Sequence, residues 1–238
     1  MYSFTSRIRF SETGRDRKLT LESLLDYFQD CSTFQSEDLG IGIDFLKEKD
    51  QAWVVNYWQL VIEEYPSLGE TVRICTLPYD FKGCLGYRNF YMENEQGKRI
   101  VSADSLWTLL NMKKMFPARP GADMVKLYGR EERIPMEYEP RRIALTGEVR
   151  QGEAIPVRPY HLDCNGHVNN GQYVRMAAGV LSADSKVRQL RVEYRRQAVL
   201  GDVLLPYIYE AEERAAVSLC REEGRPCAVV EFKFVKTS

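Results

Sequence analysis

Histidine is nearly absent from this sequence, because only two occur among its 238 residues and both lie in the stretch from Tyr160 to Tyr173. Paired cysteines are absent as well: the six cysteines are scattered and none belongs to a C-x-x-C motif. This pattern excludes the usual disulfide framework and zinc motif, and it is typical of thiols that a cytosolic protein keeps reduced. We therefore expect no metal and no cofactor.

Long apolar runs are also missing, since none approaches the ~18 residues that a membrane-spanning helix needs. The first ten residues have neither the apolar core of a signal peptide nor the features of a transit peptide, which favours the cytoplasm. The 33 Lys and Arg residues nearly balance the 34 Asp and Glu residues. A net charge of −1 gives no indication of a nucleic acid or an anionic membrane as partner.

The two histidines belong to a polar stretch in which Asp163, Asn165 and His167 occupy alternate positions. Side chains two residues apart point to the same side of an extended or looping segment. A carboxylate can accept a proton from water, an imidazole titrates near neutral pH, and an amide can hold water or a carbonyl oxygen. The combination predicts acid–base chemistry. For each residue taken singly, a polar loop that caps a helix is the alternative.

A helix is expected directly after this stretch, over residues 171–181, with Asn169 or Asn170 as its N-cap. The polar cluster would then lie at a helix N-terminus, where free backbone N–H groups favour a developing negative charge. The N–H groups of residues 168–171 are therefore candidate donors of an oxyanion hole for acyl transfer.

The rest of the chain predicts an α+β protein in which an antiparallel sheet wraps one long helix. The strongest helix is expected over residues 19–38, with Thr20 as its cap, and shorter helices over 43–48 and 122–128. Alternating apolar residues and turn signals predict strands over residues 3–10, 52–64, 71–79, 87–93, 99–112, 146–159, 187–195, 203–211, 215–222 and 228–235.

The sequence also predicts an internal duplication. Leu68-Gly69-Glu70 and Leu200-Gly201-Asp202 each follow a similar strand, and both halves show the order helix, strand, turn, strand, hairpin. We expect an N-terminal repeat over residues 1–116, a proline-containing linker over 117–145 and a C-terminal repeat over 146–238. Residues 14–18, Gly-Arg-Asp-Arg-Lys, offer no counterpart to the Asp-x-Asn-x-His stretch.

The pattern Asp163-x-Asn165-x-His167-x-Asn169-Asn170-x-x-Tyr173 resembles the active-site signature of the acyl-acyl-carrier-protein thioesterases, the plant chain-terminating enzymes of fatty-acid synthesis and their bacterial relatives. A second run, from Val192 to Ala198, is similar to the Glu-Tyr-Arg-Arg-Glu-Cys run of the plant enzymes. Here the last two positions are Gln197 and Ala198, so a cysteine nucleophile is impossible at that place. The resemblance implies a tandem (double) hot-dog fold, with two antiparallel sheets each wrapped around a long helix.

The resemblance further implies that the protein hydrolyses fatty-acyl thioesters of acyl carrier protein. In this scheme Asp163 accepts a proton from the attacking water, directly or through His167, and His167 relays charge or protonates the leaving thiolate. Asn165 and Gln197 position the water or the thioester. The residues expected to bind substrate are Val168, Asn169, Asn170, Gly171 and Tyr173. An acyl tunnel is expected in the first repeat, for which the candidates are Trp53, Trp58, Tyr57 and Phe28, with core packing as the alternative role.

Carrier protein is acidic in this family, so exposed basic residues are candidate contacts: Lys113, Lys114, Arg119, Arg141, Arg142, Arg195 and Arg196. Three other functions stay open: an acyl-CoA thioesterase, a hot-dog dehydratase, and a non-catalytic acyl-binding module that lost the glutamate at position 197. The oligomeric state is open too. Hot-dog sheets pair edge to edge, and either the tandem repeat or a homodimer satisfies that need.

Overall fold

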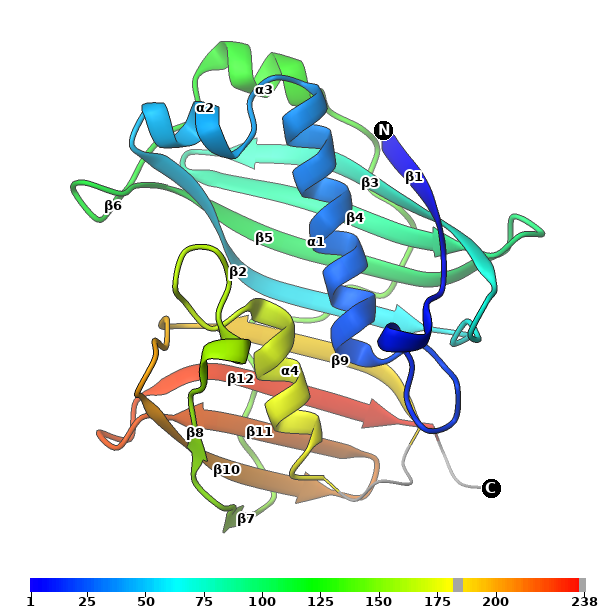
Figure 1. Ribbon diagram of the computed structural model, residues 1–238, viewed down its shortest axis with the longest axis vertical. Coiled ribbons are helices and arrows are strands. Elements are labelled where there is room, and N and C mark those ends of the chain that lie inside the picture. Colours follow the sequence, from blue (N-terminus) through cyan, green and yellow to red (C-terminus); the bar gives the residue numbers. More distant parts are fainter. Residues whose placement is uncertain (182–185, 236–238) are drawn as a thin grey trace. The chain divides into compact units, whose positions relative to one another are not determined.

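The computed structural model describes residues 1–181 and 186–235 (Figure 1). The chain forms two compact units, Met1–Tyr138 and Glu139–Ser238. Their boundary falls inside the segment 117–145 that the sequence marks as a linker, and residues 182–185 and 236–238 of the expected repeat 146–238 lie outside the described residues. Each unit has an antiparallel sheet with one principal helix against it, which confirms the predicted α+β, hot-dog type of fold.

The first unit is built around helix α1 (Leu21–Asp38), which lies across its sheet (Figure 1). The strand order is β1-β3-β4-β5-β2, with β6 paired to β5. The other helical elements are η1 (Phe10–Glu12), α2 (Ile43–Glu48) and α3 (Ala122–Tyr128). The strands are β1 (Tyr2–Arg7), β2 (Gln51–Ile62), β3 (Thr71–Lys82), β4 (Leu85–Glu93), β5 (Arg99–Asn111) and β6 (Phe116–Pro117).

Helix α1 forms where the sequence predicts it, because its apolar residues repeat with the helical period and its first turn is capped. The Thr20 hydroxyl accepts the N–H of Ser23 at 3.3 Å. On the buried face Phe28 packs against Trp58, with ring centroids 6.3 Å apart. Phe28, Tyr57 and Trp58 are all 2% exposed or less, in agreement with the core-packing interpretation of these aromatic residues.

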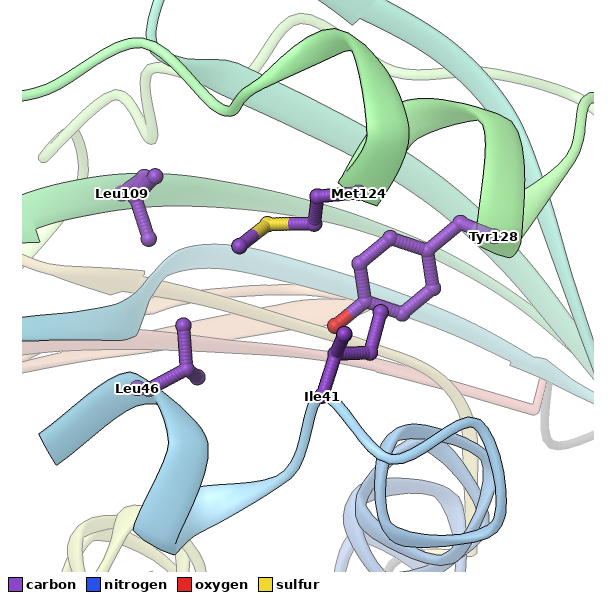
Figure 2. Packing of buried hydrophobic residues seen from close by; sticks show 5 residues of the cluster. All are labelled: Ile41, Leu46, Leu109, Met124 and Tyr128. Atoms are coloured by element: carbon purple, nitrogen blue, oxygen red, sulfur yellow. The ribbon is translucent and has the colours of Figure 1, made fainter. Parts of the chain in front are cut away.

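A second group of buried side chains closes one end of the first unit (Figure 2). Met124 and Tyr128 of α3 face Leu109 of β5, together with Ile41 and Leu46 from the α2 region. Helix α3 lies in the segment expected as a linker. Its buried residues show that this part of the segment contributes to the core of the first unit.

The second unit repeats the plan with a shorter helix, α4 (Asn170–Ala178), which ends at Gly179 and not at Leu181 as expected. The strand order is β9-β12-β11-β10-β7, and β8 also pairs with β10. The remaining elements are η2 (Pro159–His161), β7 (Glu148–Gln151), β8 (Ile155–Pro156), β9 (Val187–Tyr194), β10 (Val203–Ala211), β11 (Arg214–Cys220) and β12 (Pro226–Phe234).

The single strand predicted over residues 146–159 is wrong, because the chain forms two short strands, β7 and β8, on the same edge of β10. Gln151 lies opposite Tyr207 and Ile155 lies opposite Leu204, so residues 152–154 face the shorter stretch 205–206. This extra residue is a β-bulge. Within the bulge the N–H of Gly152 donates to the carbonyl of Pro206 at 2.8 Å.

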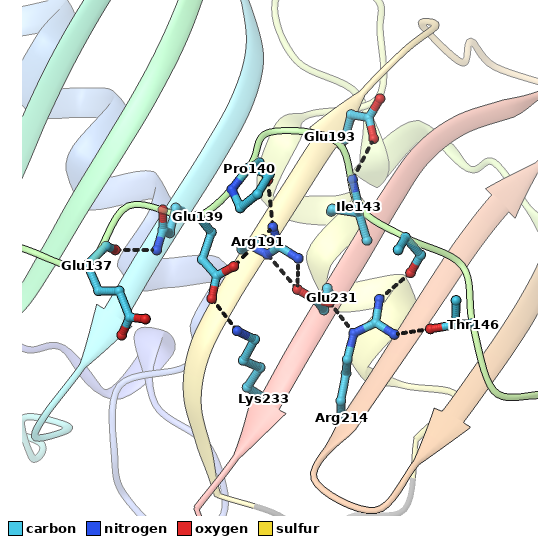
Figure 3. A network of polar contacts seen from close by, with 12 residues as sticks. Glu137, Glu139, Pro140, Ile143, Thr146, Arg191, Glu193, Arg214, Glu231 and Lys233 are labelled. Atoms are coloured by element: carbon cyan, nitrogen blue, oxygen red, sulfur yellow. Dashed lines mark hydrogen bonds and ion pairs between the residues drawn. The ribbon is translucent and has the colours of Figure 1, made fainter.

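A buried ionic network fastens residues 139–146 across one face of the second sheet (Figure 3). Glu231 is only 1% exposed and pairs with both Arg191 and Arg214. The same two guanidinium groups hold the crossing segment: Arg191 donates to the carbonyl of Pro140 at 2.7 Å, and Arg214 donates to the hydroxyl of Thr146 at 3.1 Å. The network gives the buried carboxylate of Glu231 its ionic partners and holds residues 139–146 against the sheet.

Candidate functional site

Of the two conformations considered for residues 163–167, extended or looping, the structure shows a closed turn. The N–H of Asp163 donates to the carbonyl of His167 at 2.8 Å, and the N–H of Gly166 donates to the carbonyl of Asp163 at 3.0 Å. Gly166 has a φ of 75°, a backbone conformation that a residue without Cβ adopts readily. The turn brings both ends of the motif together at the entrance to α4.

The carboxylate of Asp163 is held by the backbone of its own turn. Its Oδ1 atom accepts the N–H of Asn165 at 2.8 Å and the N–H of His167 at 3.2 Å. The side chain is half-buried, whereas Asn165 and Cys164 are exposed. Asp163 therefore holds the turn closed, and the helix cap considered as the alternative role is provided by another residue of the motif, Asn169. The turn also gives the carboxylate a defined orientation beside His167.

The second sequence motif meets the first through the backbone of Ala198. The carbonyl of Ala198 accepts the N–H of Val168 at 2.9 Å, and its N–H donates to the hydroxyl of Tyr173 at 2.9 Å. His167 also forms an isolated antiparallel bridge with Val199. Gln197, which is exposed, is thereby brought next to the motif turn.

The start of α4 differs from the oxyanion hole expected there. Asn169 is the N-cap, and its side chain accepts the N–H of Gly171 at 2.8 Å. The N–H of Asn169 donates to the carbonyl of His161 at 2.9 Å, and that of Val168 donates to Ala198. The N–H groups of Val168, Asn169 and Gly171 are thus occupied, and these three are not the free oxyanion donors that the sequence suggested. Asn170 accepts the hydroxyl of Tyr194 at its carbonyl, at 3.0 Å.

The first unit contains the same turn without the same side chains, a correspondence that the sequence did not reveal. The N–H of Gly14 donates to the carbonyl of Lys18 at 2.9 Å, and the N–H of Arg17 donates to the carbonyl of Gly14 at 3.0 Å. Arg17 has a φ of 61°, like Gly166. Residues 14–18 are therefore the backbone counterpart of 163–167. The shared signal is an Asx side chain just before the positive-φ residue, Asp16 in one turn and Asn165 in the other.

His161, which the sequence analysis left without a role, lines a pocket beside the motif. The pocket has a volume of about 440 Å³ and is lined by Glu153, Ala154, Ile155, Pro156, Tyr160, His161, Gln172, Arg175, Met176, Gly179 and Val180. The Nδ1 atom of His161 accepts the N–H of Arg158 at 3.0 Å. Burial lowers the pKa of His161, and the charges of Arg175 and Arg158 lower it further.

The basic residues proposed as carrier contacts are all exposed. Two of them form ion pairs: Lys113 with Asp50 at 2.8 Å, and Arg195 with Glu193 at 2.9 Å.

Within residues 1–181 and 186–235, no group of three or more His, Cys, Asp or Glu side chains is placed to hold a metal ion. In the same ranges, no helix is both long and apolar enough to span a bilayer.

Known proteins are similar to this chain in sequence and in structure. The chain is 27% identical over 216 residues to the chloroplastic acyl-acyl-carrier-protein hydrolase FATB1 of Cuphea viscosissima, covering 83% of this chain and 51% of that protein. This chain therefore spans about half the length of that curated relative.

Two solved structures show the fold. An acyl-ACP thioesterase from Bacteroides thetaiotaomicron has a TM-score of 0.90 at 23% identity, covering 98% of this chain and 97% of that chain. The 12:0-ACP thioesterase from Umbellularia californica has a TM-score of 0.82 at 19% identity, covering 99% and 97%.

The family models match both halves of the sequence. Acyl-ACP thioesterase N-terminal domain matches residues 1–128, and Acyl-ACP thioesterase C-terminal domain matches residues 144–224, the part that contains the Asp163–His167 turn and Gln197. The chain belongs to the acyl-ACP thioesterase family.

Proposed function

We propose that this protein hydrolyses fatty-acyl thioesters of acyl carrier protein and releases a free fatty acid. The observation that carries the proposal is the turn of residues 163–167, where an oriented carboxylate and an imidazole sit one bridge away from the Gln197 segment. The same turn in the first unit has Gly14 and Lys18 in place of Asp163 and His167, and its one carboxylate, Asp16, stands at the position of Asn165. The backbone of the turn therefore folds without the acid–base pair of the second unit.

In the proposed reaction the oxygen of water forms a bond to the thioester carbonyl carbon, and the C–S bond then breaks. The carboxylate of Asp163 accepts the proton of the attacking water, and His167 delivers a proton to the departing thiolate. A thiolate is a good leaving group, so the step needs no covalent enzyme intermediate. Gln197 orients the water but cannot take its proton, because an amide has no basic oxygen comparable to a carboxylate.

Negative charge on the tetrahedral intermediate requires hydrogen-bond donors. Because the N–H groups of Val168, Asn169 and Gly171 are already engaged, we assign this task to the exposed side-chain amides of Asn165 and Gln197. Tyr173 and Ala198 hold the two segments in place. Val168 to Gly171 then form the wall against which the thioester end of the substrate is positioned.

The proposed partner is acyl carrier protein with a bound acyl chain, which approaches the enzyme through the exposed basic residues.

The proposed compartment is the cytoplasm. All six cysteines are free thiols, which supports a reducing environment. A homodimer stays a proposal of equal standing with a monomer, and sedimentation of the purified chain distinguishes the two.

The experiment that tests the function incubates the purified protein with a panel of acyl-carrier and acyl-CoA thioesters and measures both free thiol and organic product. Release of thiol with free acid, faster from the carrier than from CoA, supports the proposal. Faster release from CoA identifies an acyl-CoA thioesterase, and an enoyl thioester identifies a dehydratase. Saturable binding of an acyl carrier with no product would identify a binding module, in line with the loss of a carboxylate at position 197.

A further inference from the structure

The pocket beside His161 lies where the edge strand of the second unit is interrupted. In the first unit β1 pairs with β3 without a break, from Tyr2 opposite Thr76 to Arg7 opposite Thr71. In the second unit the bulge at residues 152–154 separates β7 from β8. Residues Glu153 to Pro156 line the pocket, so the cavity lies directly at the irregularity.

The first unit fills the corresponding space with aromatic rings. Phe4 of β1 stacks on Tyr27 of α1 with centroids 6.2 Å apart, and it meets Phe34 edge-on at 5.3 Å. Counted from the two equivalent turns, Phe4 corresponds to Glu153 and Tyr27 corresponds to Met176. The second unit therefore has smaller or polar side chains where the first has a stacked pair, and the space stays open.

The polar groups around the pocket have a definite hydrogen-bonding character. Because Nδ1 of His161 accepts a backbone N–H, the neutral ring carries its proton on Nε2 and is a donor there. His161 is 9% exposed and lines the pocket, whereas Arg175 is exposed. From helix α4, Arg175 contributes a guanidinium group to the pocket lining and Gln172 contributes an amide. Among the described residues, no salt bridge engages Arg175.

The apolar part of the wall comes from the other lining residues, Ala154, Ile155, Pro156, Met176 and Val180. A volume of about 440 Å³ is within the size range of small-molecule sites. One carboxylate, that of Glu153, also lines the pocket and opposes an anion there. Arg175 is the one arginine among the described lining residues, and its charge, together with that of Arg158 outside the lining, acts on His161.

We propose that this pocket is a binding site for an alkyl carboxylate, whose head group is held by Arg175 and the Nε2–H of His161 and whose chain lies on Ile155, Pro156 and Met176. A guanidinium matches the two oxygens of a carboxylate in geometry and charge. The site is separate from the 163–167 turn in its residues. The inference rests on the pocket and not on the proposed hydrolysis.

The test exploits the fact that the chain has only two histidines. Decanoate is titrated into the protein carrying Asp163→Asn, and the imidazole resonances of both histidines are followed by NMR. The expected result is a saturable shift of the His161 ring with the His167 ring unchanged. A shift of His167 with no change at His161 would overturn the proposal, because it would place the carboxylate at the motif turn.

Two further ligands test the head-group contacts and the alkyl-chain contacts of the proposed site separately. Acetate has the head group without the chain, and decanol has the chain without the charge. Each is expected to bind at least about tenfold more weakly than decanoate, as one charge-assisted contact or a buried alkyl chain contributes that much. Binding of acetate or decanol as tight as that of decanoate would contradict the proposal.

Three variants complete the design. Arg175→Gln is expected to weaken decanoate binding about tenfold, and Glu153→Phe is expected to abolish it by filling the space as Phe4 does in the first unit. Arg188→Gln removes an exposed charge outside the pocket and should leave the affinity unchanged. Unaltered decanoate affinity in both Arg175→Gln and Glu153→Phe, with the fold confirmed by thermal melting, would overturn the site.

Discussion

The turns at residues 14–18 and 163–167 have the same backbone hydrogen bonds and different side chains. Lys18 stands where the second unit has His167, and Gly14 stands where it has Asp163. Both turns lead into the principal helix of their unit and are tied by a bridge to a following strand end, at Ser67 and at Val199 respectively. The comparison shows that the turn is a structural element of the repeat, and that its chemistry is decided by two or three side chains.

The sheets show a second contrast on the face crossed by the connecting segment. In the first unit Gln59 lies opposite Asp104, and its amide donates to the carbonyl of Glu137 at 2.8 Å. In the second unit Arg191 lies opposite Glu231 and donates to the carbonyl of Pro140. The same cross-strand position thus holds a neutral–acidic pair in one unit and a full ion pair in the other.

The largest effect is expected from removing the acid–base groups of the second turn. Asp163→Asn and His167→Gln should each lower the kcat of acyl-carrier hydrolysis about 10³-fold, since proton transfer in the transition state loses its donor or acceptor. The asparagine keeps an oxygen for the N–H groups of Asn165 and His167, so the turn should persist. Thiol release measures the rate.

The matched control for that experiment is Asp16→Asn in the first turn, which should leave kcat unchanged. Full activity of both Asp163→Asn and His167→Gln would show that the second turn has no more chemistry than the first. The proposed function would then fail.

The second largest effect is expected from the two cross-strand pairs, whose loss should lower stability by different amounts. Glu231→Ala leaves Arg191 and Arg214 buried without their carboxylate and should lower the free energy of unfolding by about 3 kcal/mol. Asp104→Asn keeps the hydrogen bonds from Tyr79 and Asn89 in modified form and should cost about 1 kcal/mol. Urea denaturation compares them, and equal losses would contradict the distinction.

A smaller effect on stability is expected from Asp26, a residue that differs between the two principal helices. Burial, followed by the charges of Asp30, Glu22 and Glu12, raises the pKa of Asp26 to about 6, whereas α4 has Arg175 at the matching place. The folded state holds this proton more tightly than the unfolded state, so Asp26 makes stability fall as pH rises from about 4 to 6. Asp26→Asn should stabilise the protein by about 1–2 kcal/mol at pH 7.

The pH dependence provides the check on Asp26. Thermal melting at pH 4.5 and pH 7 should show the gain from Asp26→Asn at the higher pH and little of it at the lower pH. A gain of the same size at both pH values would mean that the charge is not its cause.

The smallest effect is expected at the helix caps. Thr20→Ala and Asn169→Ala each remove a side-chain acceptor from the first turn of a helix and should each cost about 1 kcal/mol. Thr20→Ser and Asn169→Asp keep the acceptor and are the controls. Calorimetric melting of all four variants measures the losses, and equal stability of the alanine variants and their controls would be the contrary result.

Helix α1, the hairpins and the repeat of the fold could be predicted because their signals are local: a helical apolar period, a capping threonine and glycine-containing turns. The division of residues 146–159 into β7 and β8 could not, since a bulge depends on which residue of β10 lies opposite. The ionic network of Glu231 depends on three strands and a crossing segment that meet only in the folded chain.

For the candidate site, the proximity of the two motifs could be predicted, and the structure brings them together at Ala198. The turn geometry could not, because an alternating pattern does not distinguish an extended segment from a closed Asx turn. The N–H group of Gly171 is held by the Asn169 cap, which the sequence predicts as one of two candidates. The N–H groups of Asn169 and Val168 are held by the carbonyls of His161 and Ala198, which no periodicity connects to them.

Ala198 joins the two motifs with its peptide groups alone, and its side chain is completely buried. The placement of the 163–167 turn consequently depends on the backbone at residue 198 and not on the chemistry of the side chain there. Because that methyl group is completely buried, a larger side chain at 198 is expected to disturb both motifs at once.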